Sequence, residues 1–170
     1  MGYDMHHRKS GDGEDGYFRL NVWGMAEYRK HMLHTGMAFM VESAIPPWPE
    51  CEDYGIAYED YAAVKYADDS DYDSHREAMT SKAQAKVAKY IADLEKVLRW
   101  HGDKGFGIPV HKFSTNDGWI VTPDECRDAM RIWRSGGAKP LPGHSDAVDY
   151  WNRWIKFLEL AAERDGFEVH

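Results

Sequence analysis

The chain has 170 residues and a formal net charge of −8, and 43% of its residues are hydrophobic. A chain of this length can bury the core of one domain without metals or disulfides, and its two cysteines are too few for a disulfide framework. The negative charge opposes binding to nucleic-acid phosphates. The sequence shows neither the run of roughly 18 apolar residues of a membrane span nor the apolar segment of a signal peptide. We therefore expect one cytoplasmic domain over residues 1–170 that binds neither nucleic acids nor membranes.

Hydrophobic patterns define the predicted elements of the N-terminal part. Met1–Met5 is compatible with a short strand, and Tyr17–Trp23 alternates apolar and polar residues as a half-buried strand does. Met25–Thr35 predicts a helix, because its Met and Tyr residues fall on one stripe and Gly36 is suited to end it.

Prolines and acidic residues dominate the middle of the chain. Prolines at positions 46, 47 and 49 disfavour regular structure, and Glu50–Asp73 carries nine acidic residues against one basic residue. We predict that residues 46–73 form a mobile acidic segment, with one helical stretch over Ile56–Tyr66. A longer helix is predicted over Ser74–His101, with a capping box between Ser74 and Glu77.

The C-terminal part has the clearest local signals. Ile108–Val121 predicts a β-hairpin closed by an Asn-Asp-Gly turn. A helix is expected to follow, with Thr122 as its cap and Glu125 completing a capping box. The last helix is expected to begin at Ser145, and Phe167–Val169 is suited to a final strand.

These elements predict an α+β fold, in which a small, mostly antiparallel sheet packs against several helices. The sheet is expected to include Tyr17–Trp23 and the Ile108–Val121 hairpin. The helices beginning at Ser74 and Ser145 are expected to cover it.

Two histidines are candidate metal ligands. His31 and His34 lie three residues apart on the predicted helix, so their side chains share one face. This spacing can seat two ligands of a zinc ion, which also needs a third ligand and a supporting outer shell. The alternative is a solvated or hydrogen-bonded helix face without metal, which is the commoner origin of such a pair. Nothing else in the sequence requires a cofactor.

Aromatic and turn residues are candidates for contacts with a ligand or partner. The Asn-Asp-Gly-Trp stretch places polar groups and an indole at one turn, where functional sites often lie, although a tight turn needs the same residues for its backbone. Tyr and Trp are common in interface hot spots, although most such rings fill cores. The candidate contact residues are Trp23, Tyr58, Tyr61, Asn116, Asp117 and Trp119. Cys126 falls on an apolar stripe, which predicts a buried, unreactive thiol.

Three stretches carry a resemblance to known proteins: Tyr17–Met25, Asn116–Cys126 and Trp154–Val169, which total about a fifth of the chain. Together with the opening Met-Gly-Tyr-Asp, they resemble small uncharacterised proteins encoded by actinobacteria and their bacteriophages. The resemblance implies a phage or mobile-element context, and it carries over no catalytic residue.

Three functions are compatible with these features. The leading hypothesis is a non-enzymatic accessory protein of phage type that binds a host protein or a small signalling molecule, because recognised catalytic motifs are absent and Trp and Tyr are abundant. The first alternative is a metal-dependent hydrolase or nucleotide-processing enzyme that uses His31 and His34 with a carboxylate. The second alternative is a nucleotide-sequestering protein that stacks bases on Trp23 or Trp119.

Overall fold

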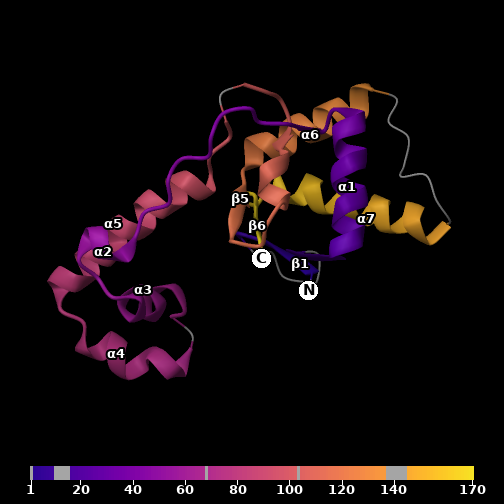
Figure 1. The fold of residues 1–170 in the computed structure, drawn as a ribbon. Coiled ribbons are helices and arrows are strands. Elements are labelled where there is room, and N and C mark those ends of the chain that lie inside the picture. Colours follow the sequence, from indigo (N-terminus) through magenta and orange to yellow (C-terminus); the bar gives the residue numbers. More distant parts are fainter. Residues whose placement is uncertain (1, 10–15, 68, 103, 137–144) are drawn as a thin grey trace. The chain divides into compact units, whose positions relative to one another are not determined.

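The computed structural model describes residues 2–9, 16–67, 69–102, 104–136 and 145–170. By its internal contacts the chain divides into two compact units. The first unit comprises residues 1–44 and 101–170, and the second comprises residues 45–100. Figure 1 labels the α-helices of both units and some of the strands of the first unit.

The first unit is built on a four-stranded antiparallel sheet in the order β2-β1-β6-β5. Its strands are β1 (Gly2–His7), β2 (Tyr17–Asn21), β5 (Trp119–Val121) and β6 (Phe167–Val169). Tyr3 pairs with Leu20, and Met5 pairs with Val169. Two short strands, β3 (Ala38–Phe39) and β4 (Ile108–Pro109), pair in parallel beside it as a separate small sheet.

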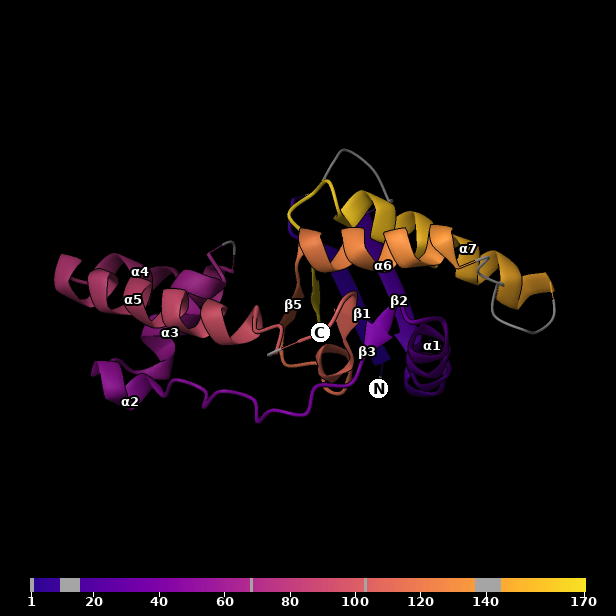
Figure 2. The ribbon, with the colours of Figure 1, turned by 90° about the horizontal axis from the view of Figure 1, so that it is seen from above.

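Helices α1 (Val22–Thr35), α6 (Pro123–Ser135) and α7 (Ser145–Ala161) belong to this unit, together with the short 3₁₀ helix η3 (Val110–Phe113). Helices α6 and α7 run alongside each other, as Figure 2 shows. The core between helices and sheet is aromatic. The ring of Trp154 lies 5.2 Å from that of Phe18 and 5.9 Å from that of Phe167, measured between ring centroids. Both ends of the chain thus contribute to one hydrophobic core.

The second unit consists of helices α2 (Cys51–Tyr54), α3 (Tyr58–Lys65), η2 (Ser70–Tyr72), α4 (Asp73–Ala78) and α5 (Ser81–Leu98). Its small core is formed by Ile56, Val87 and Tyr90. Partly buried side chains around them include Tyr54 and Tyr61. The amphipathic helix α5 therefore supplies one wall of this core.

The predicted α+β class is confirmed, including the mostly antiparallel sheet covered by helices. The strands predicted at the beginning and end of the chain are present as β1 and β6. The Thr122–Glu125 capping box is confirmed, because the side chain of each residue accepts from the backbone N–H of the other. The helix predicted from Ser145 is also present.

The boundary between the predicted strand and helix near Trp23 is wrong. Strand β2 ends at Asn21, whose Oδ1 accepts a hydrogen bond of 2.7 Å from the backbone N–H of Gly24. Because Asn is a strong N-cap residue, this contact begins α1 at Val22 and places Trp23 on the helix. The other end of the helix is as predicted, since Gly36 adopts the left-handed conformation that ends it.

The single long helix predicted over Ser74–His101 is also wrong. Helix α4 ends at Ala78, Met79 is extended, and a second helix begins at Ser81. Thr80 caps that second helix, because its Oγ1 accepts from the backbone N–H of Ala83 at 3.2 Å. The Thr80 cap therefore begins a new helix inside the stretch that was predicted to form one helix. Helix α5 ends at Leu98.

The Ile108–Val121 hairpin is not formed. Strand β4 pairs in parallel with β3, residues Val110–Phe113 form a 3₁₀ helix, and β5 pairs with β6. Gly118, which was expected to close the hairpin, instead donates its backbone N–H to the carbonyl oxygen of Val169 at 2.9 Å. Strand β5 thus pairs with the final strand of the chain, and β4 pairs with β3.

Two expectations about organisation stay predictions. Residues 46–73 contain the helices α2, α3 and η2. The mobility of this segment stays a prediction, because a single structure does not describe motion. The sequence predicts one domain, and the internal contacts of the chain divide it into two compact units. That both units belong to one domain stays a prediction. In the described part of the chain, no helix combines the length and the hydrophobicity that crossing a bilayer requires.

Candidate functional site

The two candidate zinc ligands lie on the last two turns of α1. His31 is half-buried, and its ring meets the ring of Trp151 edge-on with 4.7 Å between the centroids. His34 is exposed. The described residues contain no group of three or more His, Cys, Asp or Glu side chains arranged to hold a metal ion. The zinc site therefore stays a prediction from spacing.

The predicted contact residues of the first unit have contrasting environments. Trp23 is 83% exposed on α1, whereas Trp119 is 3% exposed and donates its indole N–H to Thr115 Oγ1 at 3.1 Å. Asn116 donates from its amide to the carbonyl oxygen of Gly2 at 3.1 Å, which ties the turn to β1. Asp117 is exposed beside it. Trp23 and Asp117 are thus accessible, while the Trp119 ring serves the core.

Tyr58 and Tyr61 lie together on α3 in the second unit. Tyr58 is 57% exposed, and its ring meets that of Tyr61 at 6.0 Å between centroids. Tyr61 in turn packs edge-on against the buried Tyr90 at 5.3 Å. Tyr61 therefore anchors the pair to the core of this unit, and Tyr58 presents its ring to solvent.

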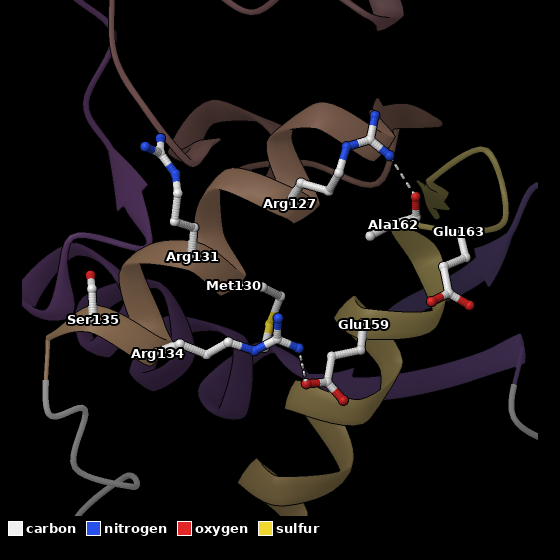
Figure 3. Close-up of a pocket in the computed structure, with 8 residues that line it drawn as sticks. All are labelled: Arg127, Met130, Arg131, Arg134, Ser135, Glu159, Ala162 and Glu163. Atoms are coloured by element: carbon white, nitrogen blue, oxygen red, sulfur yellow. Dashed lines mark hydrogen bonds and ion pairs between the residues drawn. The ribbon is translucent and has the colours of Figure 1, made fainter.

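A groove between α6 and α7 is the most developed candidate site of the first unit (Figure 3). Its cavity volume is about 560 Å³, within the ~300–1,000 Å³ range of ligand sites. Arg127, Arg131 and Arg134 line it from α6, at spacings of four and three residues that keep them on one helix face. Glu159 lines it from α7, and Glu163 lines it from the turn that follows α7.

Two arginines of α6, on either side of Met130, reach α7 and the turn that follows it, as Figure 3 shows. Arg127 donates to the carbonyl oxygen of Ala162 at 2.8 Å, and Arg134 donates to the Glu159 carboxylate at 2.8 Å. Met130 is 3% exposed and contributes an apolar surface between them. The groove is therefore apolar at its centre and charged along its sides.

The guanidinium groups keep considerable capacity for further contacts. The side chains of Arg127, Arg131 and Arg134 are 57%, 65% and 67% exposed. Asp124 and Asp128 pair with Arg127 and Arg131 from one turn earlier on the same helix. Exposed pairs of this kind contribute only about 0.2–1 kcal/mol each, and a guanidinium carries five N–H donors. These pairs orient the arginines. Because the pairs are weak, a binding partner can replace them at a small cost in free energy.

An exposed aromatic ring extends the arginine row. The guanidinium carbon of Arg131 lies 5.6 Å from the centroid of the Phe106 ring, which is 68% exposed. Such a cation–π contact further orients the guanidinium. The row Arg127–Arg131–Arg134 and the ring of Phe106 therefore form one continuous exposed surface.

A buried ionic network lies next to the start of α6. Lys112 is 0% exposed and donates from Nζ to both carboxylate oxygens of Glu125 at 2.7 and 2.8 Å, and to the carbonyl oxygen of Ile120 at 2.7 Å. Glu125 is 2% exposed. His101 donates from Nδ1 to Glu125 Oε1 at 2.7 Å and is 36% exposed. His101 is the member of this network that meets solvent.

The network affects the protonation of His101. Its hydrogen bond to the Glu125 carboxylate raises the pKa of the imidazole above the usual value of 6.5, while partial burial acts in the opposite direction. Because the folded-state pKa is raised, the protonated form is favoured by folding. The stabilisation is complete below about pH 6.5 and is lost as the pH rises through the folded-state pKa.

We expect the stability difference between the wild-type protein and a His101→Asn variant to be larger at pH 5.5 than at pH 8.5. Urea unfolding of both proteins at each pH measures this difference, and the comparison cancels groups that titrate equally in both. A difference that stays constant, or that grows with pH, contradicts the role assigned to the His101–Glu125 hydrogen bond.

Cys126 follows Glu125 and is fully buried. Burial raises the pKa of its thiol strongly, which keeps the sulfur protonated and unreactive. The structure thus agrees with the expectation of a buried, inert cysteine, despite its place in the first turn of α6.

The sequence contained a usable signal for the arginine groove. The 127, 131, 134 spacing is visible in the chain, and it indicates one helix face. The opposing face of α7 is set by tertiary packing, which no local pattern reveals. Lys112 gave no signal, because lysine is almost never fully buried unless it is paired.

Comparison with known proteins adds no relative. No protein-family model matches the chain, and no curated protein or solved structure does so. Function is therefore inferred from the residues of this chain alone.

Proposed function

We propose that this protein is a non-enzymatic binding protein that docks a protein partner in the α6–α7 groove. The row Arg127–Arg131–Arg134 opposite Glu159 and Glu163 carries this proposal. Arginine is enriched at interface hot spots, and the volume and mixed charge of the groove suit a partner surface. The phage-type context of such a role rests on the resemblance of the sequence.

Charge complementarity indicates the chemistry of the partner. The groove side chains comprise three arginines and two glutamates, so the lining has a net charge of +1, whereas the whole chain carries −8. A partner helix would place acidic side chains against α6, basic side chains against α7 and an apolar side chain over Met130. A groove between two helices is a common binding site for such an amphipathic helix.

Site-specific photocrosslinking in the source cells tests this proposal. A photoreactive amino acid is placed at Ser135, which lines the groove, or at Glu27, an exposed position on α1. We expect a discrete protein adduct from position 135 and none from position 27. Mass spectrometry of the adduct then shows whether the crosslinked partner segment is an amphipathic helix.

Matched charge reversals supply the control. Arg131→Glu should reduce the adduct from position 135 about tenfold or more, because truncating a hot-spot arginine costs at least about 2 kcal/mol. Lys30→Glu, an equal charge change at an exposed position of α1, should leave it unchanged. Absence of an adduct at position 135, or an adduct insensitive to Arg131→Glu, would reject docking in this groove.

A further inference from the structure

A second cavity lies within the second unit and is independent of the α6–α7 groove. Its volume is about 680 Å³. Lysines and an aspartate of α5 line one side, and Tyr54 with Asp53 of α2 lines another. The segment with Trp48 between two prolines completes the lining. Its size and its mixture of aromatic walls with a few polar groups are typical of small-molecule sites.

Two lysines of this cavity interact with nearby carboxylates only at longer range, Lys86 with Asp60 and Lys89 with Asp93. Lys86 and Lys89 lie three residues apart on α5, so they share a face of the helix. Lys86 is half-buried and donates to the carbonyl oxygen of Gly55 at 3.1 Å. Lys89 Nζ lies 5.7 Å from the centroid of the Tyr54 ring. Within the described residues, neither ammonium group forms an ion pair.

Among the residues that the structure describes, Lys86 and Lys89 form no ion pair although carboxylates are abundant around them. The neighbouring stretch Glu50–Asp73 has nine acidic residues and one basic residue, so carboxylates are abundant in this unit. An ammonium group has three donors, and one carbonyl or one ring face uses only part of that capacity. Lys86 and Lys89 can therefore each donate to an incoming anion, and both line the same cavity.

The other groups of the cavity are acceptors and rings. Asp93 accepts from the Tyr54 hydroxyl at 2.8 Å and from Lys96 at 2.6 Å, and these hydrogen bonds lower the pKa of its carboxyl group. Asp93 therefore stays ionised near neutral pH. Its carboxylate and that of Asp53 can accept hydrogen bonds from hydroxyl or amino groups, while the rings of Trp48 and Tyr54 offer surfaces for a planar group.

We propose that this cavity binds a small aromatic phosphate of the nucleoside monophosphate class. The phosphate contacts Lys86 and Lys89, the base lies against the ring of Trp48 or Tyr54, and the sugar hydroxyls donate to Asp53 or Asp93. Aromatic stacking tolerates any base, so the site distinguishes phosphates from nucleosides better than it distinguishes bases.

Titration calorimetry on the full-length protein tests the proposal with three kinds of probe. The probes are the four ribonucleoside 5′-monophosphates, the corresponding nucleosides, and inorganic phosphate. We expect at least one monophosphate to bind with a stoichiometry near one, and its nucleoside and inorganic phosphate to bind at least about tenfold more weakly. Such a difference corresponds to about 1.4 kcal/mol, as one charge-assisted hydrogen bond provides.

Paired variants locate the binding. Lys86→Gln combined with Lys89→Gln should weaken binding of the monophosphate at least about tenfold. Lys82→Gln, a single change of the same kind at an exposed position of α5 that does not line the cavity, should leave it unchanged. Circular dichroism melting shows whether each variant is folded. If the double variant unfolds, the single variant Lys89→Gln, at an exposed position, serves in its place.

Three results would overturn the proposal. The first is that no monophosphate binds at millimolar concentration. The second is binding that the lysine variants do not change. The third is that the nucleoside or inorganic phosphate binds with the same affinity as the monophosphate. None of these results bears on the α6–α7 groove, because the crosslinking positions and Arg131 lie in the other unit.

Discussion

Replacement of Lys112 by methionine is expected to destabilise the protein by about 3–5 kcal/mol, the usual cost of removing one partner from a buried ion pair. Both carboxylate oxygens of Glu125 accept from Lys112, and Glu125 is 2% exposed. Without Lys112, a buried carboxylate is left with His101 as a half-exposed partner. Urea denaturation at pH 7, followed by circular dichroism, measures the loss.

A double-mutant cycle shows whether the loss comes from the pair itself. Glu125→Gln removes the charge and keeps an oxygen that can accept from the Thr122 backbone N–H, as Glu125 does at 2.7 Å. The variant carrying both changes should be more stable than Lys112→Met alone, because no uncompensated charge is then buried. Strictly additive losses would show that Lys112 acts through its packing and its hydrogen bond to the Ile120 carbonyl, and not through Glu125. Lys82→Met, at an exposed position, should change stability by less than about 0.5 kcal/mol.

Local signals in the sequence were sufficient for the ends of several helices. Thr122 and Glu125 form their capping box within four residues, and Gly36 ends α1 by its own backbone preference. Such features depend on neighbours in the chain. The capping box predicted at Ser74 and Glu77 is wrong, because α4 begins at Asp73 without a side-chain cap. The start of α5, capped by Thr80, was not predicted.

Pairing between strands could not be predicted in the same way. Trp119–Val121 has the apolar character of a buried strand, but its partner is the last strand of the chain instead of the nearby Ile108–Pro109. The choice depends on where α6 and α7 return the chain to the sheet. Long-range contacts of this kind have no signature in a short window of sequence.

The same difference between local and long-range information applies to the candidate sites. The arginine row is readable from the spacing of residues 127, 131 and 134, because a helix face is a local property. Its opposition to Glu159 depends on the packing of α7 against α6. In the second unit, Trp48 and Lys86 line one cavity although they are distant in sequence. Sequence patterns thus indicated single faces, and tertiary packing assembled the sites.

Gly166→Ala is expected to destabilise the protein by about 2–5 kcal/mol, which combines left-handed backbone strain of ~1–2 kcal/mol with ~1–3 kcal/mol of overpacking. Gly166 has a φ of 79°, and a Cβ atom there would lie 2.0 Å from the carbonyl oxygen of Val121. That oxygen belongs to the backbone at the end of β5, so relief requires the end of β5 to move away from β6.

Gly118→Ala separates the two contributions. Gly118 has a φ of 84°, but its added Cβ would meet only the His170 ring, at 3.4 Å. This variant should therefore show the backbone strain alone, about 1–2 kcal/mol. Urea unfolding of both variants gives the comparison, and hydrogen exchange at Ile120 and Val121 should accelerate further in Gly166→Ala than in Gly118→Ala. Equal losses in the two variants would mean that β5 accommodates the added methyl group without separating from β6.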